Sequence, residues 1–132
     1  MYRLYVHRDA KRDLDQLWET SKTATAAARI VALLEDLQGN QDLLDRLTQH
    51  DFGVGRSEPF HVSKWFEHWN KGKDLWRLKL WDLEAVGLKY RVVYAYTPGI
   101  RQYNILAIAP RSFGYAEDHP LTQRILRAFD NP

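Results

Sequence analysis

The sequence predicts an α+β domain in which helices pack on a small, mainly antiparallel sheet. Helical periodicity fills the first third of the chain, and three strand-like segments follow one another between Leu75 and Arg111. A short alternating segment precedes the helices, and another helical segment follows the strands. We therefore expect the order strand, helix, helix, strand, strand, strand, helix, within a single domain that spans residues 1–132.

The N-terminal elements are predicted to be a strand and a helical hairpin. Residues 2–7 alternate like a strand, and the segment behind them has apolar residues at helical spacing, with Asp9 as the expected N-cap. A second helical run begins after Thr23 and ends at Gly39, which suits a helix C-terminus. A shorter helical segment at residues 41–49 follows. Together these helices should cover one face of the sheet.

The middle of the chain, from His50 to Gly72, mixes glycine, proline, aromatic and charged residues, and we expect a loop with a short helix there. The three strands read LWRLKLW, KYRVVYAY and YNILAIAPR, and Pro98-Gly99 supplies the turn between the last two. His119-Pro120 marks the start of the terminal helix, because proline suits the first helical position.

Composition limits the protein classes that fit. Hydrophobic residues make up 45% of the 132 residues and charged residues 27%, which excludes disorder. There is no cysteine, so disulfides, thiolate metal sites and cysteine nucleophiles are excluded, and a reducing cytoplasm is the natural setting. No run is as long as a membrane span, and the N-terminus is too polar for a secretory signal. We expect a cytoplasmic protein with no membrane contact.

Charge is unevenly distributed along the chain. The net charge is only +2, but residues 56–111 hold ten Lys and Arg residues against five acids. A basic sheet on a nearly neutral protein predicts a local anionic partner such as RNA.

The basic residues also follow the strand period. Side chains two apart on a strand share a face, so Arg77, Lys79 and Trp81 should point one way and the residues between them toward the core. If the strands pair as a meander, Arg91 of the next strand and Arg111 at the end of the last join this face. Four cations would then converge on one small surface.

These residues also have ordinary structural explanations. Lys and Arg commonly occupy the solvent face of an antiparallel strand. Arg111 is also able to pair with Glu117 or Asp118. Tyr115 fits a half-buried tyrosine, and His119 fits a helix-entry residue. Both kinds of explanation stay open at this point.

Four segments, LWRLKLW, KYRVVYAY, YNILAIAPR and RSFGYAEDHPLTQRIL, resemble in their order and spacing the RelE/ParE superfamily of bacterial toxins, specifically its mRNA-cleaving RelE-like branch. The resemblance covers most of the chain. It implies a β-α-α-β-β-β-α fold, with the sheet packed by an N-terminal helical hairpin and a C-terminal helix. It also implies the toxin of a type II toxin-antitoxin system, an endoribonuclease that cleaves mRNA in the ribosomal decoding site and is neutralised by a cognate antitoxin.

The resemblance assigns residues as well. Arg77 and Lys79 lie on the strand that carries the family's paired basic residues, with arginine at 77 where lysine is expected. Arg91 and Arg111 match arginines of the next two strands. Tyr115 corresponds to a late tyrosine of the family, although it follows Arg111 more closely than in the RelE prototype.

Cleavage by the ribose 2′-hydroxyl needs a base, positive charge around the reacting phosphate and help for the leaving 5′-oxygen. The three arginines suit the charge role because their forks bind phosphate oxygens. Tyr115, Lys79 and His119 are the alternatives for proton transfer, and nearby cations are expected to lower the pKa of the tyrosine. Trp81 is the candidate for stacking on an RNA base, or else it packs under the terminal helix.

A second functional class remains open: a family member without nuclease activity, either a ParE-like poison of DNA gyrase or an antitoxin-binding module. The same fold would serve both classes, so fold resemblance does not decide between them. No cofactor is expected, because there is no glycine-rich phosphate loop and because His61 and His68 match no metal-binding spacing.

Overall fold

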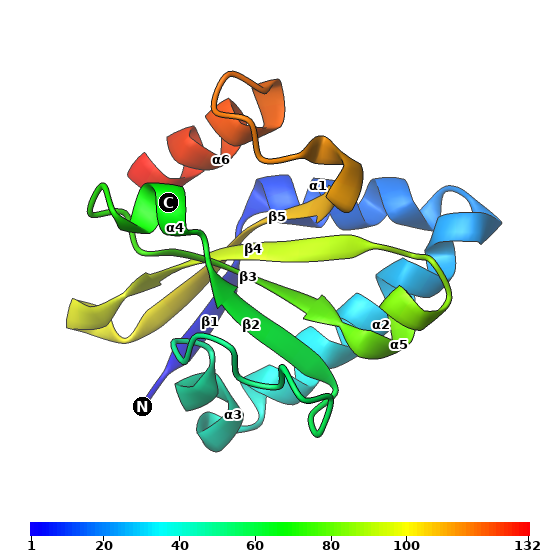
Figure 1. Cartoon of the computed structure of the whole chain (residues 1–132), viewed down its shortest axis with the longest axis horizontal. Coiled ribbons are helices and arrows are strands. Elements are labelled where there is room, and N and C mark those ends of the chain that lie inside the picture. The colour runs from blue at the N-terminus through cyan, green and yellow to red at the C-terminus, as the bar shows by residue number, and fades with distance from the viewer.

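The computed structural model describes all residues, 1–132, and has an α+β architecture around one five-stranded sheet (Figure 1). The elements in chain order are β1 (Arg3–Val6), α1 (Arg8–Trp18), α2 (Ser21–Gln38), α3 (Gln41–Arg46), β2 (Phe60–Lys64), α4 (Phe66–Trp69), β3 (Leu75–Leu80), α5 (Trp81–Ala85), β4 (Tyr90–Thr97), β5 (Gln102–Pro110) and α6 (Pro120–Asp130). The predicted α+β class with a mainly antiparallel sheet is confirmed. None of the helices combines the length and the apolar character needed to cross a membrane.

The strands lie in the order β1-β5-β4-β3-β2. The four strands from β2 to β5 pair antiparallel with their neighbours, whereas β1 pairs parallel with β5, Arg3 opposite Gln102. A short 3₁₀ turn at Pro98–Ile100 joins β4 to β5, as the Pro98-Gly99 signal predicted. The first strand therefore enters the sheet beside a partner far away in sequence.

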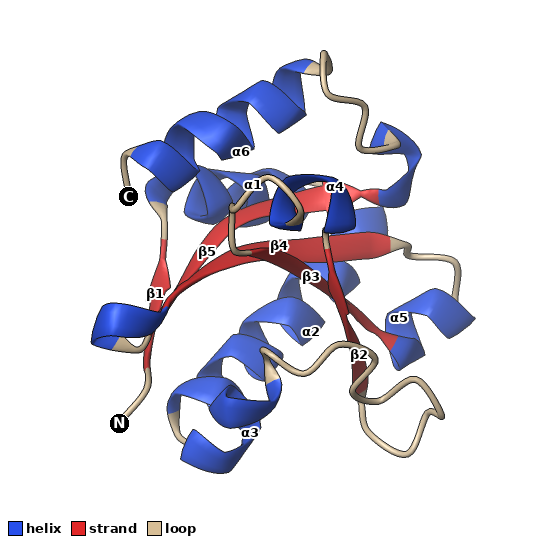
Figure 2. Ribbon diagram, turned by 60° about the vertical axis from the view of Figure 1, so that its left-hand side comes forward, coloured by secondary structure: helices blue, strands red, loops and turns tan.

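Side chains on the two faces of the sheet form two separate hydrophobic cores. The larger core lies against α1, α2 and α3, and its bulkiest fully buried side chains are Trp76, Tyr94 and Tyr103. The smaller core lies on the opposite face, where Ile125 and Ala128 of α6 pack on the strands. Figure 2 shows α2 and α3 on one side of the sheet and α6 on the other.

A partly buried ion pair joins α1 to α6 beside β5. Asp13 of α1 accepts a hydrogen bond from the backbone N–H of Ile108 at 2.9 Å. Arg124 of α6 donates to both oxygens of the same carboxylate, at 2.9 and 2.6 Å. Asp13 thus satisfies a backbone N–H of β5 beyond the part of the strand that pairs with β1. Its bidentate contact with Arg124 holds α6 against α1.

The segment from His50 to Gly72 differs from the expected loop, because it contributes the edge strand β2 as well as the short helix α4. Phe60 and Val62 are buried in the larger core, while His61 and Ser63, which alternate with them, point to the other face. Five residues give too short an alternation to stand out beside the flanking aromatic residues. Pairing with β3 is what stabilises this strand.

Three local expectations were wrong. α2 begins at Ser21 with Thr20 as its N-cap, and not after Thr23. The N-cap of α1 is His7, whose Nδ1 accepts from the backbone N–H of Asp9, so Asp9 is a first-turn residue. Trp81 does not extend the strand that carries Arg77 and Lys79, because β3 ends at Leu80 and Trp81 begins α5.

Candidate active site

A cavity of about 300 Å³, here called the basic pocket, opens on the sheet face that also carries α6. Its walls come from β2, β3, β4 and the segment that follows β5. It is lined by His61, Ser63, Arg77, Leu78, Lys79, Arg91, Arg111 and Tyr115. The predicted convergence of the four cations on one surface is therefore observed, and Tyr115 joins them.

Strand register explains why these side chains meet. On β2 and β3, His61 is paired with Lys79 and Ser63 with Arg77, so their side chains lie next to each other on one face. Arg77 is in turn paired with Val93 on β4, two residues after Arg91. The alternating pattern of these strands thus places every polar residue of the set on the same side.

Arg77 and Tyr115 pack on each other. Arg77 donates through Nε to Ser63 Oγ at 3.2 Å, and its guanidinium carbon lies 4.6 Å from the centre of the Tyr115 ring. The hydroxyl of Tyr115 is buried and makes no hydrogen bond. Burial raises the pKa of Tyr115, and the opposing effects of Arg77 and Arg91 are smaller. The cations act in the expected direction, but burial outweighs them, so the pKa of Tyr115 is raised overall and Tyr115 remains a neutral phenol.

Arg91 is held by a nearly buried ion pair. Its Nη2 lies 3.0 Å from Glu84 Oε1 of α5, and the two side chains are only 11% and 14% exposed. Its Nη1 donates to the carbonyl of Tyr90 at 3.1 Å. The guanidinium is thus fixed in direction, and part of its charge is compensated by Glu84.

Lys79 is a partly buried residue of the pocket lining. Burial lowers the pKa of Lys79, and repulsion by Arg91 lowers it further, while Glu84 acts in the opposite direction. Its Nζ lies 4.8 Å from the centre of the Trp81 ring. The ammonium group of Lys79 therefore gives up a proton more readily than an ordinary lysine.

Arg111 is exposed and forms no ion pair. The alternative in which it pairs with Glu117 or Asp118 is not observed, since Glu117 lies 3.2 Å from Lys71 instead. The backbone N–H of Arg111 donates to the carbonyl of Lys89, which fixes the segment beside the start of β4. Arg111 therefore presents a free guanidinium at the mouth of the pocket.

Trp81 lies beside the basic pocket rather than in its lining, and it is absent from the core under α6. Its indole N–H donates to the carbonyl of Gly53 at 2.9 Å. The ring is parallel to that of His61, with 5.7 Å between centres, and Arg56 lies 4.6 Å from the centre of the indole. Trp81 therefore does not pack under the terminal helix, and stacking on an RNA base stays a prediction. Its contacts in the structure support His61 and Lys79.

His119 lies outside the pocket. It is the N-cap of α6, where its Nδ1 accepts from the backbone N–H of Leu121 at 3.0 Å, and its ring lies edge-on to Phe113. The interpretation of His119 as a helix-entry residue is confirmed, and the geometry gives it no contact with the four cations.

The pair formed by His61 and Asp51 was missed by sequence reasoning, because the segment that contains both was expected to be a loop. His61 Nε2 lies 3.0 Å from Asp51 Oδ1. The alternation of residues 60–63 is the signal that would have placed His61 on the polar face. The hydrogen bond from His61 lowers the pKa of Asp51. No group of three or more His, Cys, Asp or Glu side chains in the chain is arranged to hold a metal ion.

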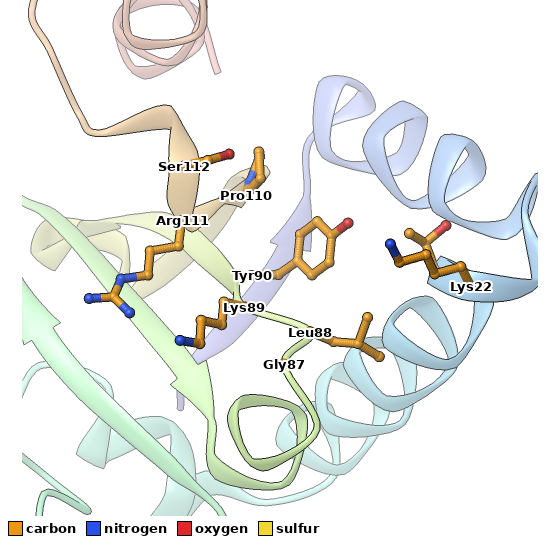
Figure 3. A pocket seen from close by; sticks show the side chains of 9 residues that line it. Lys22, Gly87, Leu88, Lys89, Tyr90, Pro110, Arg111 and Ser112 are labelled. Carbon is orange, nitrogen blue, oxygen red and sulfur yellow. The ribbon is translucent and has the colours of Figure 1, made fainter.

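A larger hollow of about 590 Å³ adjoins the basic pocket and shares Arg111 with it. Figure 3 shows Lys89 and Arg111 extending to the same side, while Tyr90 faces Lys22 of α2 across the hollow. The hollow contains three exposed cations that form no ion pair: Lys22, Lys89 and Arg111. The positive surface therefore continues beyond the basic pocket, past the start of β4.

No protein-family model, curated protein or solved structure matches this chain. The functional argument therefore depends on the side chains of the basic pocket and on the adjoining hollow.

Proposed function

We propose that this protein is the toxin of a type II toxin-antitoxin pair, a RelE-like endoribonuclease that cleaves mRNA by attack of a ribose 2′-hydroxyl on the adjacent phosphate. One observation carries the proposal: Arg77, Lys79, Arg91 and Arg111 line a single cavity that has no carboxylate in its lining, and Arg91 is the one of the four that forms an ion pair, with Glu84. These are also the positions that the resemblance assigns. The RelE-like topology is part of the proposal.

The arginines supply charge where the reaction develops it. Negative charge accumulates on the oxygens of the five-coordinate phosphorus, and preorganised donors stabilise it strongly in a partly buried site. Arg77 and Arg111 have no carboxylate partner, so their forks remain available to phosphate oxygens. Arg91, held by Glu84, strengthens the local field from a fixed position.

Lys79 is suited to protonate the leaving 5′-oxygen. Burial and Arg91 lower the pKa of its ammonium group, which makes it a better acid than a solvated lysine. Tyr115, kept neutral by burial, is suited to donate a hydrogen bond to a phosphate oxygen rather than to accept a proton. Among the three proton-transfer candidates of the sequence, Lys79 therefore takes the acid role.

The adjoining hollow is suited to the next nucleotides of a single strand. Lys22 and Lys89 would contact backbone phosphates, and Tyr90 offers an aromatic surface to a base or ribose. The proposal takes its target, mRNA on the ribosome, and its partner, a cognate antitoxin, from the resemblance. An antitoxin segment that covers the basic pocket would block phosphate binding.

The test is to induce the protein in growing cells and map the 5′ ends of mRNA. New ends that depend on the protein support the proposal. Arg77→Ala and Arg111→Ala should each reduce cleavage by about 100-fold or more, the scale for removing one donor to a developing anion. Arg3→Ala is the matched control, because Arg3 is exposed on β1 at the opposite edge of the sheet. Intact transcripts during growth arrest, with inhibited supercoiling by gyrase, would instead favour the ParE-like alternative.

A further inference from the structure

His61 is the one imidazole in the basic pocket. It lies on β2 directly opposite Lys79, and its side chain is 15% exposed. Tyr115 is held neutral, Lys79 is placed to donate a proton, and His119 lies outside the pocket. The site still needs a group that accepts a proton, and imidazole exchanges protons near neutral pH.

Asp51 determines which nitrogen of His61 carries the proton. An ionised carboxylate only accepts hydrogen bonds, so the contact of 3.0 Å between Asp51 Oδ1 and His61 Nε2 places the hydrogen on Nε2. The neutral ring then has its lone pair on Nδ1, which forms no hydrogen bond within the protein. The hydrogen bond that lowers the pKa of Asp51 keeps this carboxylate ionised.

The surrounding backbone holds both residues in place. Asp51 has φ of 67°, a left-handed conformation that is uncommon for a residue with a Cβ atom. Its N–H donates to the carbonyl of Val62, and the N–H of Val62 donates to Phe52, so this loop is attached to β2 beside His61. On the other side, Trp81 lies parallel to the imidazole and is fixed by Gly53.

Charged groups face His61 from several elements. Asp51 contacts it from the preceding loop, with His50 on the other oxygen of that carboxylate. Lys79 and Arg77 on β3, Arg91 on β4 and Arg111 after β5 line the same cavity. The imidazole thus lies between a carboxylate that orients it and the cations that would hold a phosphate.

We propose that His61 is the general base of the cleavage reaction and that Asp51 is its positioning residue. His61 Nδ1 takes the proton of the 2′-hydroxyl, the 2′-oxygen bonds to phosphorus, and the bond from phosphorus to the 5′-oxygen breaks. The 5′-oxygen leaves with a proton from Lys79, which gives a 2′,3′-cyclic phosphate and a 5′-hydroxyl. Solvent then reprotonates Lys79 and deprotonates His61. This inference rests on the proposed function.

Single-turnover cleavage, by the purified full chain, of an RNA oligonucleotide bound as mRNA to purified ribosomes tests the pair. His61→Gln should lower the rate at neutral pH by about 100-fold or more, the usual scale for losing a general base. Binding of the same oligonucleotide with a 2′-deoxy cleavage site should change by less than about threefold. Asp51→Asn should lower the rate less, by about tenfold, and asparagine tolerates the left-handed backbone at this position.

His50→Gln is the matched control. His50 also contacts Asp51, at 3.5 Å, but it accepts from the backbone N–H of Lys64, packs on Phe66 and lies outside the basic pocket. Its variant should keep the rate of the unmodified protein. The pH profile of the cleavage rate distinguishes a catalytic role of His61 from a merely structural one. The rate of the unmodified protein should fall on the acid side as the base is protonated, and His61→Gln should lack this fall.

The outcomes are distinguishable. An unchanged rate and acid limb in His61→Gln, with Arg77→Ala inactive, would overturn the base assignment and leave the proposed function standing. Absence of a cyclic phosphate product from the unmodified protein would overturn both. Should His61→Gln fail to fold, His61→Ala with added imidazole replaces it: a rate restored by imidazole supports the base role, and a rate that imidazole does not change overturns it.

Discussion

One face of the sheet is covered by α1, α2 and α3, whereas the other is divided between α6 and the basic pocket. On the covered face the largest side chains are fully buried, and the hydroxyl of Tyr94 reaches the carbonyl of Leu47 at 2.7 Å. On the other face a smaller core continues directly into a cavity lined by cations. The same three strands, β2 to β4, supply both faces.

On these strands, the residues that point into the larger core stabilise the fold, and the residues that alternate with them line the basic pocket. Strained backbone conformations are also concentrated at and beside the basic pocket. Four residues other than glycine have positive φ. Tyr115 lines the basic pocket, Asp51 contacts His61 of its lining, and Arg56 lies over Trp81 beside it. Residues held in such conformations cluster at functional sites, where the surrounding structure maintains them. The fourth, Arg101, lies at the end of the turn between β4 and β5.

The largest expected effect separates two neighbours on β3. Trp76→Ala should lower the free energy of unfolding by about 3–5 kcal/mol, because it empties a fully packed position of the larger core. Arg77→Ala should change it by less than about 1 kcal/mol while cleavage is lost. Urea unfolding of both variants measures this. Equal destabilisation by the two substitutions would contradict the division between the faces.

Gly53 connects the pocket to its supporting loop, and its replacement should have the next largest effect. Gly53 has φ of +79°, and a Cβ atom there would lie 1.9 Å from the carbonyl oxygen of Phe60. Gly53→Ala should therefore cost about 1–3 kcal/mol and lower the cleavage rate, because the carbonyl of Gly53 holds Trp81 beside His61. Urea unfolding and single-turnover rates measure the two effects.

Gly55→Ala is the control for this substitution. No atom lies within 4 Å of the position that its Cβ would take. Stability and cleavage should both stay close to those of the unmodified protein. A similar loss in both glycine variants would mean that loop flexibility, rather than the contact with Phe60, determines the effect.

The sequence predicted the convergence of the cations because strand alternation is a local property. Arg77 and Lys79 are two apart, and antiparallel pairing of β3 with β4 brings Arg91 toward them. The hairpin at Pro98-Gly99 returns the chain along β4, so that Arg111 follows the end of β5 beside Arg91. Such a pattern depends only on the period of the strand and on the turn. The α+β class followed from the same local signals.

The pKa shifts of the site could not be predicted from the sequence, because they depend on contacts between residues that are far apart in the chain. Tyr115 is buried by Trp65, fifty positions earlier in the chain, and by Phe113, and this burial decides the direction of its pKa shift. Burial lowers the pKa of Lys79, and repulsion by Arg91 of the neighbouring strand lowers it further. The pairing of His61 with Asp51 required β2, which only the tertiary pairing with β3 reveals.

The smallest expected effect concerns His68, a buried polar residue on the α6 side of the sheet. It is 1% exposed, neither ring nitrogen has a hydrogen-bond partner, and it packs edge-on to Trp65 of the smaller core. Burial lowers the pKa of His68, with Glu67 opposing the shift. The folded protein therefore binds this proton less readily than the unfolded chain, whose histidines titrate near pH 6.5.

The sign of the pH dependence follows from this difference. Below about pH 6.5 the unfolded state takes up a proton that the folded state resists, so stability is lost as the pH falls, by at most about 1.4 kcal/mol per pH unit. His68→Leu removes this contribution and leaves no unpaired nitrogen in the interior. Urea unfolding at pH 5 and pH 7.5 should show a smaller difference in the variant than in the unmodified protein. Identical differences would mean that water reaches His68, and that this part of the α6 face is less closed than the core under α1, α2 and α3.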